Sequence, residues 1–281
     1  MTFTVRTLLG LTLSLCLLSS AHAQRLVVAG GAITEMVYAL GAEDQLVAVD
    51  DTSVWPPEAR QLTRVGYVRD LPVEGIVALR PDKVLVSEGE AGPQTTLAHL
   101  QRVTEVVTVD AAHSPEGVLR RARQVADATG QKAQGEALVA ELDAAFADIR
   151  KRLPLSDPPR VLCVLAAGSH GVRVAGRDTQ AQALLDSLGL PNAAGEVRGY
   201  RPLSAEALLA LAPDMVIIAE TMPGHFKADD WPTLAATPAG RNGRVLVADS
   251  MLLLGFGPRL PDAMRLVLDA AEGRGGVAWS R

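Results

Sequence analysis

The sequence contains little cysteine, with two residues in a chain of 281. Cys16 lies in an apolar N-terminal segment, and Cys163 lies in the apolar run 161–165. A thiol in such a run is typical of an inert core position, and one cysteine leaves no disulfide within the rest of the chain. The protein therefore depends on a hydrophobic core, which a chain of this length can bury.

Aromatic residues and positive charge are also scarce. Aromatics make up 4% of the chain, and the net charge is -5 with no basic stripe, which argues against a dedicated nucleic-acid binder. The hydrophobic fraction of 48% excludes intrinsic disorder. What remains is a globular protein of one large domain or two modest ones.

Signatures of catalysis and of zinc binding are missing. The chain has no GxSxG, P-loop, HExxH or CxxC motif. His99, His113, His170 and His225 stand at no ligand spacing such as i, i+4, and we expect the first two at the surface. The sequence therefore favours a binding protein over an enzyme and argues against a zinc site.

The long apolar run is confined to the N-terminus. Residues 8–18 follow the positive charge of Arg6 and precede Ala21-His22-Ala23, which is the order of a secretory signal peptide. The run is shorter than the roughly 20 residues that a membrane span needs. We expect residues 1–23 to be removed and the protein to reach the periplasm without membrane insertion; a short N-terminal anchor is the alternative.

Apolar runs typical of strands alternate with helical patterns, which predicts parallel βαβ units. The predicted strands cover residues 26–29, 46–49, 84–86, 106–109, 161–165, 215–219 and 245–248. The predicted helices include 33–40, 74–79, 94–102, 115–129, 179–188 (after an Asp178 cap) and 261–272.

One segment occurs twice. GYVRDLPVEGIVALRPD at residues 66–82 aligns with GYRPLSAEALLALAPD at 199–214 with a gap of one residue. The alignment pairs Tyr67 with Tyr200 and Glu74 with Glu206. Such similarity at half-chain spacing predicts two related lobes. Carboxylates near helix N-termini are commonplace and stabilising, so the two acids are either helix-dipole residues or a matched pair of docking charges.

Between the halves, residues 131–153 carry apolar side chains at helical spacing, and Pro154 ends the pattern. A helix of about 22 residues spans roughly 33 Å. The predicted fold is α/β, with two related lobes, each a parallel-type sheet flanked by helices, joined by one long bridging helix. The predicted organisation is a signal peptide (1–23), an N-terminal lobe (24–130), the bridging helix (131–154) and a C-terminal lobe (155–281), with a ligand cleft between the lobes.

Three segments resemble one protein family. Residues 29–41 (AGGAITEMVYALG), 65–69 (VGYVR) and 255–259 (GFGPR) are similar to the periplasmic haem-binding proteins of bacterial ABC haem importers. The similarity extends from Arg25 to about Glu272. The paired acids and the bridging helix are shared with vitamin B12 and siderophore binders, whereas the first two segments are more specific to haem.

The resemblance implies a monomeric, non-catalytic receptor that takes up ferric haem, its transported ligand, and delivers it to an inner-membrane ABC permease dimer with its ATPase. It also implies that Tyr67 is the axial ligand of the haem iron, that Arg69 assists, and that Glu74 and Glu206 dock on the permease. A corrinoid or ferric-siderophore receptor of the same superfamily is the alternative. A siderophore satisfies its iron internally, so it would not use Tyr67.

The residue chemistry suits haem. Ferric iron is a hard cation that accepts a phenolate oxygen, and a permanent Arg69 charge favours the phenolate of Tyr67. If residues 67–69 are extended, both side chains point to one side. Tyr200 is expected to be structural or to line the cleft.

Further candidates lie in loops at the expected cleft. His170 follows a predicted strand and is either a second axial ligand or a solvated loop histidine. Helix N-termini after Gly30-Gly31 and after Asp178 offer backbone N–H groups for the haem propionates. The candidate propionate partners are Arg69, Thr34, Arg173, Arg177 and Lys227. Trp55, Phe226 and Trp231 are candidates for lining an apolar porphyrin cleft, with core packing as the alternative.

Overall fold

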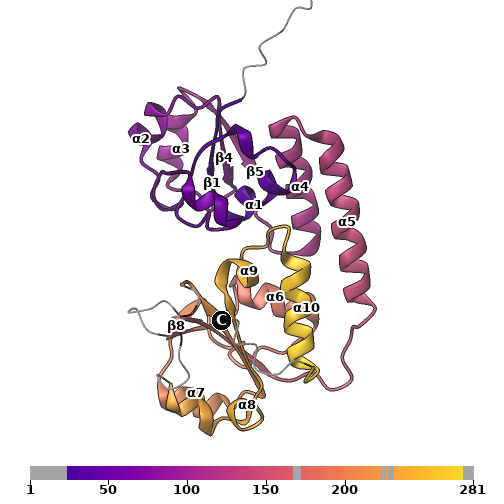
Figure 1. Ribbon diagram of the computed structural model, residues 1–281. Helices are drawn as coiled ribbons and strands as arrows, with labels where there is room; N and C mark the ends of the chain where they lie inside the picture. Colours follow the sequence, from indigo (N-terminus) through magenta and orange to yellow (C-terminus); the bar gives the residue numbers. More distant parts are fainter. Residues whose placement is uncertain (1–23, 167–171, 223, 225, 227–230, 275–281) are drawn as a thin grey trace, which may run out of the picture.

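The computed structural model describes residues 24–166, 172–222, 224, 226 and 231–274 (Figure 1). The predicted signal peptide, His170 and Lys227 lie outside these residues. The chain forms two lobes, each built on one sheet, with helices α4 and α5 along one side (Figure 1). The predicted two-lobed α/β fold is confirmed.

The N-terminal sheet is parallel throughout, in the order β3-β2-β1-β4-β5. Its strands are β1 (Leu26–Ala29), β2 (Leu46–Val49), β3 (Thr63–Arg64), β4 (Lys83–Ser87) and β5 (Glu105–Val109). The helices of this half are α1 (Gly31–Ala39), α2 (Val73–Ala78), α3 (Gln94–Leu100) and α4 (Pro115–Thr129), with 3₁₀ turns at Glu43–Gln45 and Pro57–Gln61.

The C-terminal sheet has the order β10-β9-β6-β7-β8. Its strands are β6 (Val161–Ala166), β7 (Val172–Ala175), β8 (Tyr200–Pro202), β9 (Met215–Glu220) and β10 (Val245–Asp249). β7 is antiparallel to both neighbours. The connection from β6 to β7 is too short for a parallel crossover. The helices are α6 (Gln180–Leu188), α7 (Ala205–Leu211), α8 (Pro238–Arg241), α9 (Ser250–Leu254) and α10 (Leu260–Ala271), with a 3₁₀ turn at Pro232–Ala236.

The two lobes repeat one set of hydrogen bonds at the start of a central strand. Before β1, the Arg25 amide donates to the Asp82 carboxylate at 2.8 Å, and the Asp82 amide donates back to the Arg25 carbonyl at 2.8 Å. Before β6, Arg160 and Asp214 make the same two bonds at 3.0 and 2.9 Å. Asp82 and Asp214 end the two repeated segments, so the internal alignment matches equivalent places in the fold.

The bridging helix is α5 (Lys132–Arg150), which runs antiparallel to α4 and along both lobes (Figure 1). Its buried face includes Leu142, Phe146 and Ile149, as the apolar spacing predicts. One cluster of buried side chains extends through both lobes, from β1 and α1 past α5 to β6 and α10. The lobes therefore share a continuous core, which restricts their relative motion.

Cys163 is buried in this core, and burial raises the pKa of its thiol to about 12. The thiol is therefore neutral and unreactive at physiological pH, as its apolar context predicts. Within the described ranges, no helix combines the length and the apolar character needed to cross a membrane.

Candidate ligand-binding cleft

A cleft of about 620 Å³ lies between the lobes, a size within the usual range for small-molecule sites. Loops at the carboxyl ends of strands in both sheets form its walls, as expected for parallel α/β proteins. Its polar lining includes Thr52, Tyr67, Arg69, Ser87, Glu90, His113, Arg121, Arg173, Gln180, Tyr200, Thr221 and Ser250. Its apolar lining includes Ala32, Val68, Leu165, Met251 and Leu254.

Tyr67 and Arg69 both line the cleft, but the segment that carries them is a turn and not the extended run expected from the sequence. The Asp70 amide donates to the Tyr67 carbonyl at 2.8 Å, which closes a β-turn with Arg69 at its third position. Gly66 enters this turn with a φ of 86°, a value that favours glycine. Tyr67 is left 50% exposed, so it is open to a ligand in the cleft.

Tyr200 faces the cleft from the opposite lobe, at the start of β8. Its hydroxyl donates to Gln180 Oε1 at 3.3 Å. Burial raises the pKa of Tyr200 to about 12, although the nearby charge of Arg69 acts in the opposite direction. The Tyr200 phenol therefore stays neutral at physiological pH, and Arg69 of the other lobe lines the same cleft.

The described lining carries three arginines and one carboxylate. Arg121 is buried and donates to the carbonyls of Asp110 and Phe256, at 2.6 and 2.8 Å. Arg173 donates to the Tyr200 carbonyl at 2.9 Å. Arg69 extends from the exposed turn beside Tyr67. This excess of positive charge suits a ligand with anionic groups.

His113 lies at the cleft, whereas the sequence suggested a surface position. Its Nε2 is 3.2 Å from Glu90 Oε1, and its ring meets the Phe256 ring edge-on, with centroids 5.1 Å apart. Burial raises the pKa of Glu90, but the hydrogen bond and charge of His113, together with Arg121 and Ser87, outweigh burial and leave that pKa lowered. Both residues follow a parallel strand, β4 or β5, and that position is the signal that could have identified them.

The predicted anion site at Gly30-Gly31 is already satisfied by the protein. The Gly30 amide donates to Asp50 Oδ1 at 3.0 Å and the Gly31 amide to Thr52 Oγ1 at 2.9 Å. Thr34 is fully buried, with its hydroxyl 2.7 Å from that of Ser53. The two glycines line the cleft, but their amides are committed, and the prediction of Thr34 as a propionate partner is wrong.

Gly31 is required mainly by the close approach of the Thr52 backbone within its own lobe, with Met251 of the other lobe also near. A Cβ on Gly31 would lie 2.5 Å from the Thr52 carbonyl oxygen and 2.7 Å from Met251 Cε. We expect Gly31→Ala to lower the free energy of unfolding by about 1–3 kcal/mol through overpacking. Gly75→Ala is the matched control, because its Cβ would meet nothing closer than Pro72 at 3.4 Å. Urea unfolding should show a loss for the first variant and none for the second.

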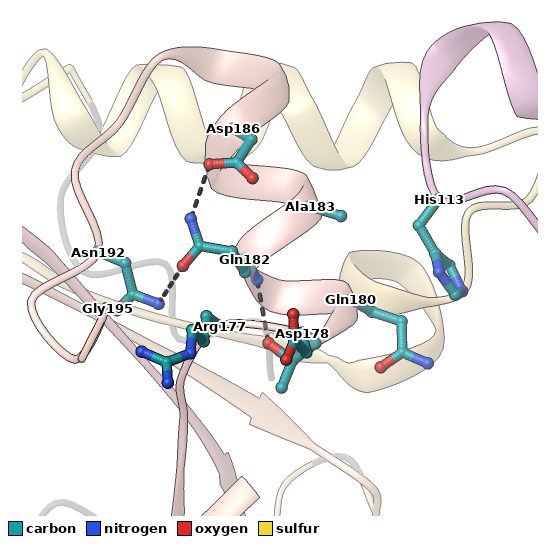
Figure 2. A pocket seen from close by; sticks show the side chains of 10 residues that line it. His113, Arg177, Asp178, Gln180, Gln182, Ala183, Asp186, Asn192 and Gly195 are labelled. Carbon is teal, nitrogen blue, oxygen red and sulfur yellow. Dashed lines mark hydrogen bonds between the residues drawn. The ribbon is translucent and has the colours of Figure 1, made fainter. Parts of the chain in front are cut away.

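Arg177 lies outside the cleft, contrary to its prediction as a propionate partner. It lines a second cavity, also of about 620 Å³, beside α6 (Figure 2). The N-cap of α6 is Thr179, whose hydroxyl accepts from the Gln182 amide at 3.1 Å. Asp178, the predicted cap, has a φ of 61° and pairs with Arg198 at 2.9 Å. The prediction was wrong by one residue, because the left-handed backbone at Asp178 turns its side chain away from the helix.

An ion pair between the buried Glu35 and the partly buried Arg259 connects the lobes beside the cleft. Arg259 Nε donates to Glu35 Oε2 at 2.9 Å, and a second contact joins the same two groups. The Arg259 guanidinium also lies 4.7 Å from the centre of the Trp55 ring. Burial raises the pKa of Glu35, and the hydrogen bond from Arg259 counteracts it. The C-terminal GFGPR segment therefore contributes to the contact between the lobes.

Glu74 and Glu206 lie outside the cleft, each in the first turn of α2 or α7. Both are exposed. Hydrogen bonds with its own backbone amide and with Ser204 lower the pKa of Glu206, so its carboxylate is charged at neutral pH. In the described part of the chain, no group of three or more His, Cys, Asp or Glu side chains is placed to hold a metal ion.

Comparison with known proteins identifies a family. The family model described as "Periplasmic binding protein" matches residues 26–252. The solved structure of the periplasmic heme-binding protein BhuT, in complex with two hemes, is 38% identical with a TM-score of 0.78, over 90% of this chain and 99% of that one.

Two curated relatives extend the comparison. An uncharacterized ABC transporter substrate-binding lipoprotein of Bacillus subtilis, YvrC, is 26% identical over 81% of this chain and 73% of the relative. A vitamin B12-binding protein of Pectobacterium atrosepticum is 28% identical over 76% of this chain and 78% of the relative.

Proposed function

Since the chain belongs to the periplasmic binding protein family, we propose that it is a periplasmic haem-binding protein, which captures ferric haem and delivers it to an inner-membrane ABC permease. The family and its relatives are substrate-binding transport proteins and not enzymes. The observation that carries the proposal is the exposed phenol of Tyr67 beside Arg69, in a cleft with an excess of positive charge.

Tyr67 is the better iron ligand of the two cleft tyrosines. A ligand must release its phenol proton, and burial opposes that release at Tyr200, whose pKa is about 12. Tyr67 is half exposed, and Arg69 lies two residues on in the same turn. Ferric iron and one arginine charge together favour the Tyr67 phenolate, which supplies a single anionic bond. Such a site suits a carrier that must also release its ligand.

The haem propionates are assigned to the arginines that face the cleft. Arg69 and Arg173 lie on opposite lobes and both line it, so they can contact the two carboxylates of one haem. Leu165, Met251 and Leu254 supply apolar surface for the porphyrin. His170 stays a candidate second ligand and Lys227 a candidate propionate partner, outside the described residues.

Delivery to the permease is assigned to Glu74 and Glu206. They stand at equivalent positions of the two lobes, on helices α2 and α7 at the outer ends of the molecule (Figure 1). Two matched acids suit a two-fold symmetric partner with a basic residue in each half. The predicted signal peptide at residues 1–23 supports a periplasmic location.

A corrinoid receptor is the second candidate, because the vitamin B12-binding relative matches three-quarters of the chain. We expect mature protein titrated with hemin to give a saturable Soret band with a high-spin ferric phenolate signature, and to show no saturable binding of cyanocobalamin. Tight binding of cobalamin without any Soret change would replace haem by the corrinoid.

The docking assignment has its own test. We expect Glu74→Lys with Glu206→Lys to abolish stimulation of the permease ATPase in nanodiscs, because like charges then meet at both contacts. The hemin titration of this variant should match that of the wild type, since both acids lie outside the cleft. Loss of hemin binding in this variant would show that the acids are not docking residues.

A further inference from the structure

Large apolar side chains of the described residues are exposed at few positions, and two of these are equivalent in the internal repeat. The exposed positions are Trp55, Tyr67, Val77, Val103, Leu209 and Met222. Val77 is on α2 and Leu209 on α7, with exposed fractions of 37% and 46%. Each lies three residues after the acid of its helix, Glu74 or Glu206.

The two helices present the same pattern to solvent and to the core. Ile76 and Leu208, which directly precede Val77 and Leu209, are fully buried in the cores of their lobes. Residues three apart share a helix face, so each helix places a carboxylate and an apolar side chain side by side on its outer surface. The intervening exposed positions are small, Gly75 on α2 and Ala207 on α7, which allows another surface to approach closely.

An exposed valine or leucine alone needs no explanation. Its duplication does, because the two lobes differ elsewhere: α2 has no side-chain cap whereas Ser204 caps α7, and the C-terminal sheet alone contains an antiparallel strand. The acid, the buried residue and the exposed apolar residue nevertheless occupy matched places in both lobes, as a partner with two equivalent halves would require.

We infer that Val77 and Leu209 are apolar contacts of the docking surface, each inserting beside the basic residue that meets Glu74 or Glu206. The occupant is the permease dimer, which must then present an apolar pocket next to a basic group in each half. The inference rests on the proposed function. Apolar burial supplies affinity that salt does not screen, whereas the acids supply orientation and salt-sensitive attraction.

The test compares three variants for binding to the haem permease–ATPase complex of the same organism in lipid nanodiscs. We expect Val77→Gln with Leu209→Gln to weaken binding about tenfold while the dependence on salt stays unchanged. Glu74→Gln with Glu206→Gln should weaken binding and flatten the salt dependence. Val103→Gln is the control, because Val103 is also an exposed valine, at 61%, but lies outside both repeated segments.

The outcomes separate this inference from the proposed function. Unchanged binding of the Val77/Leu209 variant, with weakened binding of the Glu74/Glu206 variant, overturns the inference and leaves docking through the acids intact. Unchanged binding of both variants overturns the docking assignment itself. A monomer–dimer shift on size exclusion in the Val77/Leu209 variant would assign the surface to a second copy of this chain and also overturn the inference. Equal hemin titrations and thermal unfolding confirm that every variant is folded.

Discussion

Replacing Tyr67 by alanine is expected to weaken hemin binding by more than about 100-fold. Mutating a residue that only supports a metal ligand typically lowers metal affinity by about 10–100-fold, and removing the ligand itself should lower it further. The phenolate is the anionic iron ligand assigned to the described cleft. Its removal leaves the porphyrin held by apolar contacts and by arginines at the propionates. Titration with hemin should show the loss of the ferric phenolate spectrum together with the lower affinity.

Tyr67→Phe separates ligation from packing, since it keeps the ring and removes the oxygen. We expect its spectrum to match that of the alanine variant. Tyr200→Phe is the matched control, because it removes one hydrogen bond to Gln180. Such a bond is worth about 1 kcal/mol, so hemin affinity should fall by no more than roughly fivefold. A wild-type spectrum in Tyr67→Phe, with loss of the signature in Tyr200→Phe, would transfer the ligand role to Tyr200 and reject the present assignment.

The parts of the fold that the sequence predicts are those encoded locally. Apolar runs identify the central strands of both sheets, and the duplicated segment identifies the paired positions of Glu74 and Glu206. β3, β7 and β8 were not predicted, because they lack the continuous apolar run of the central strands: their sequences are TR, VRVA and YRP. Their pairing depends on neighbouring strands elsewhere in the sequence.

The cleft is harder to predict, because its residues are selected by contacts between distant segments. Gly30-Gly31 has the local form of an anion site, but Asp50, about 20 residues away, takes the Gly30 amide. The Thr34 hydroxyl could in principle bind a ligand, but it is fully buried and hydrogen-bonded to Ser53. Arg121 lies mid-helix without any motif, and only the packing of α4 brings it to the cleft.

The contact between the lobes has an equally non-local origin. Glu35 and Arg259 are separated by 224 residues, and neither residue has a sequence pattern that predicts its partner. The pair nevertheless joins the two lobes. It lies close in sequence to Ala32 and Gly255, which line the cleft. Its energetic role can be tested apart from ligand binding.

Arg259→Ala is expected to lower the free energy of unfolding by about 3 kcal/mol at pH 7, because it leaves the Glu35 carboxylate buried without its partner. Glu35 is 5% exposed, so water cannot replace the lost bonds. The Trp55 contact adds to the loss. Arg265→Ala is the matched control, since its ion pair with Asp262 is exposed on both sides and should contribute less than about 1 kcal/mol.

The dependence on pH identifies Glu35 as the source of the loss. Burial already raises the pKa of Glu35 above 4.5, and Arg259 counteracts that rise, so Arg259→Ala raises the pKa further. An acid with a raised pKa in the folded state favours folding when protonated. Its contribution is complete below the unfolded pKa and is lost as pH rises through the folded pKa. The deficit of Arg259→Ala relative to the wild type should therefore be small near pH 4 and large at pH 7.

Glu35→Gln combined with Arg259→Ala removes the titrating group and the stranded charge together. Its deficit should be smaller than that of Arg259→Ala at pH 7 and nearly the same at both pH values. Urea unfolding of the three proteins at the two pH values measures these differences. An equal deficit of Arg259→Ala at both pH values would place the loss in packing against Trp55 instead, because that contact does not depend on the charge of Glu35.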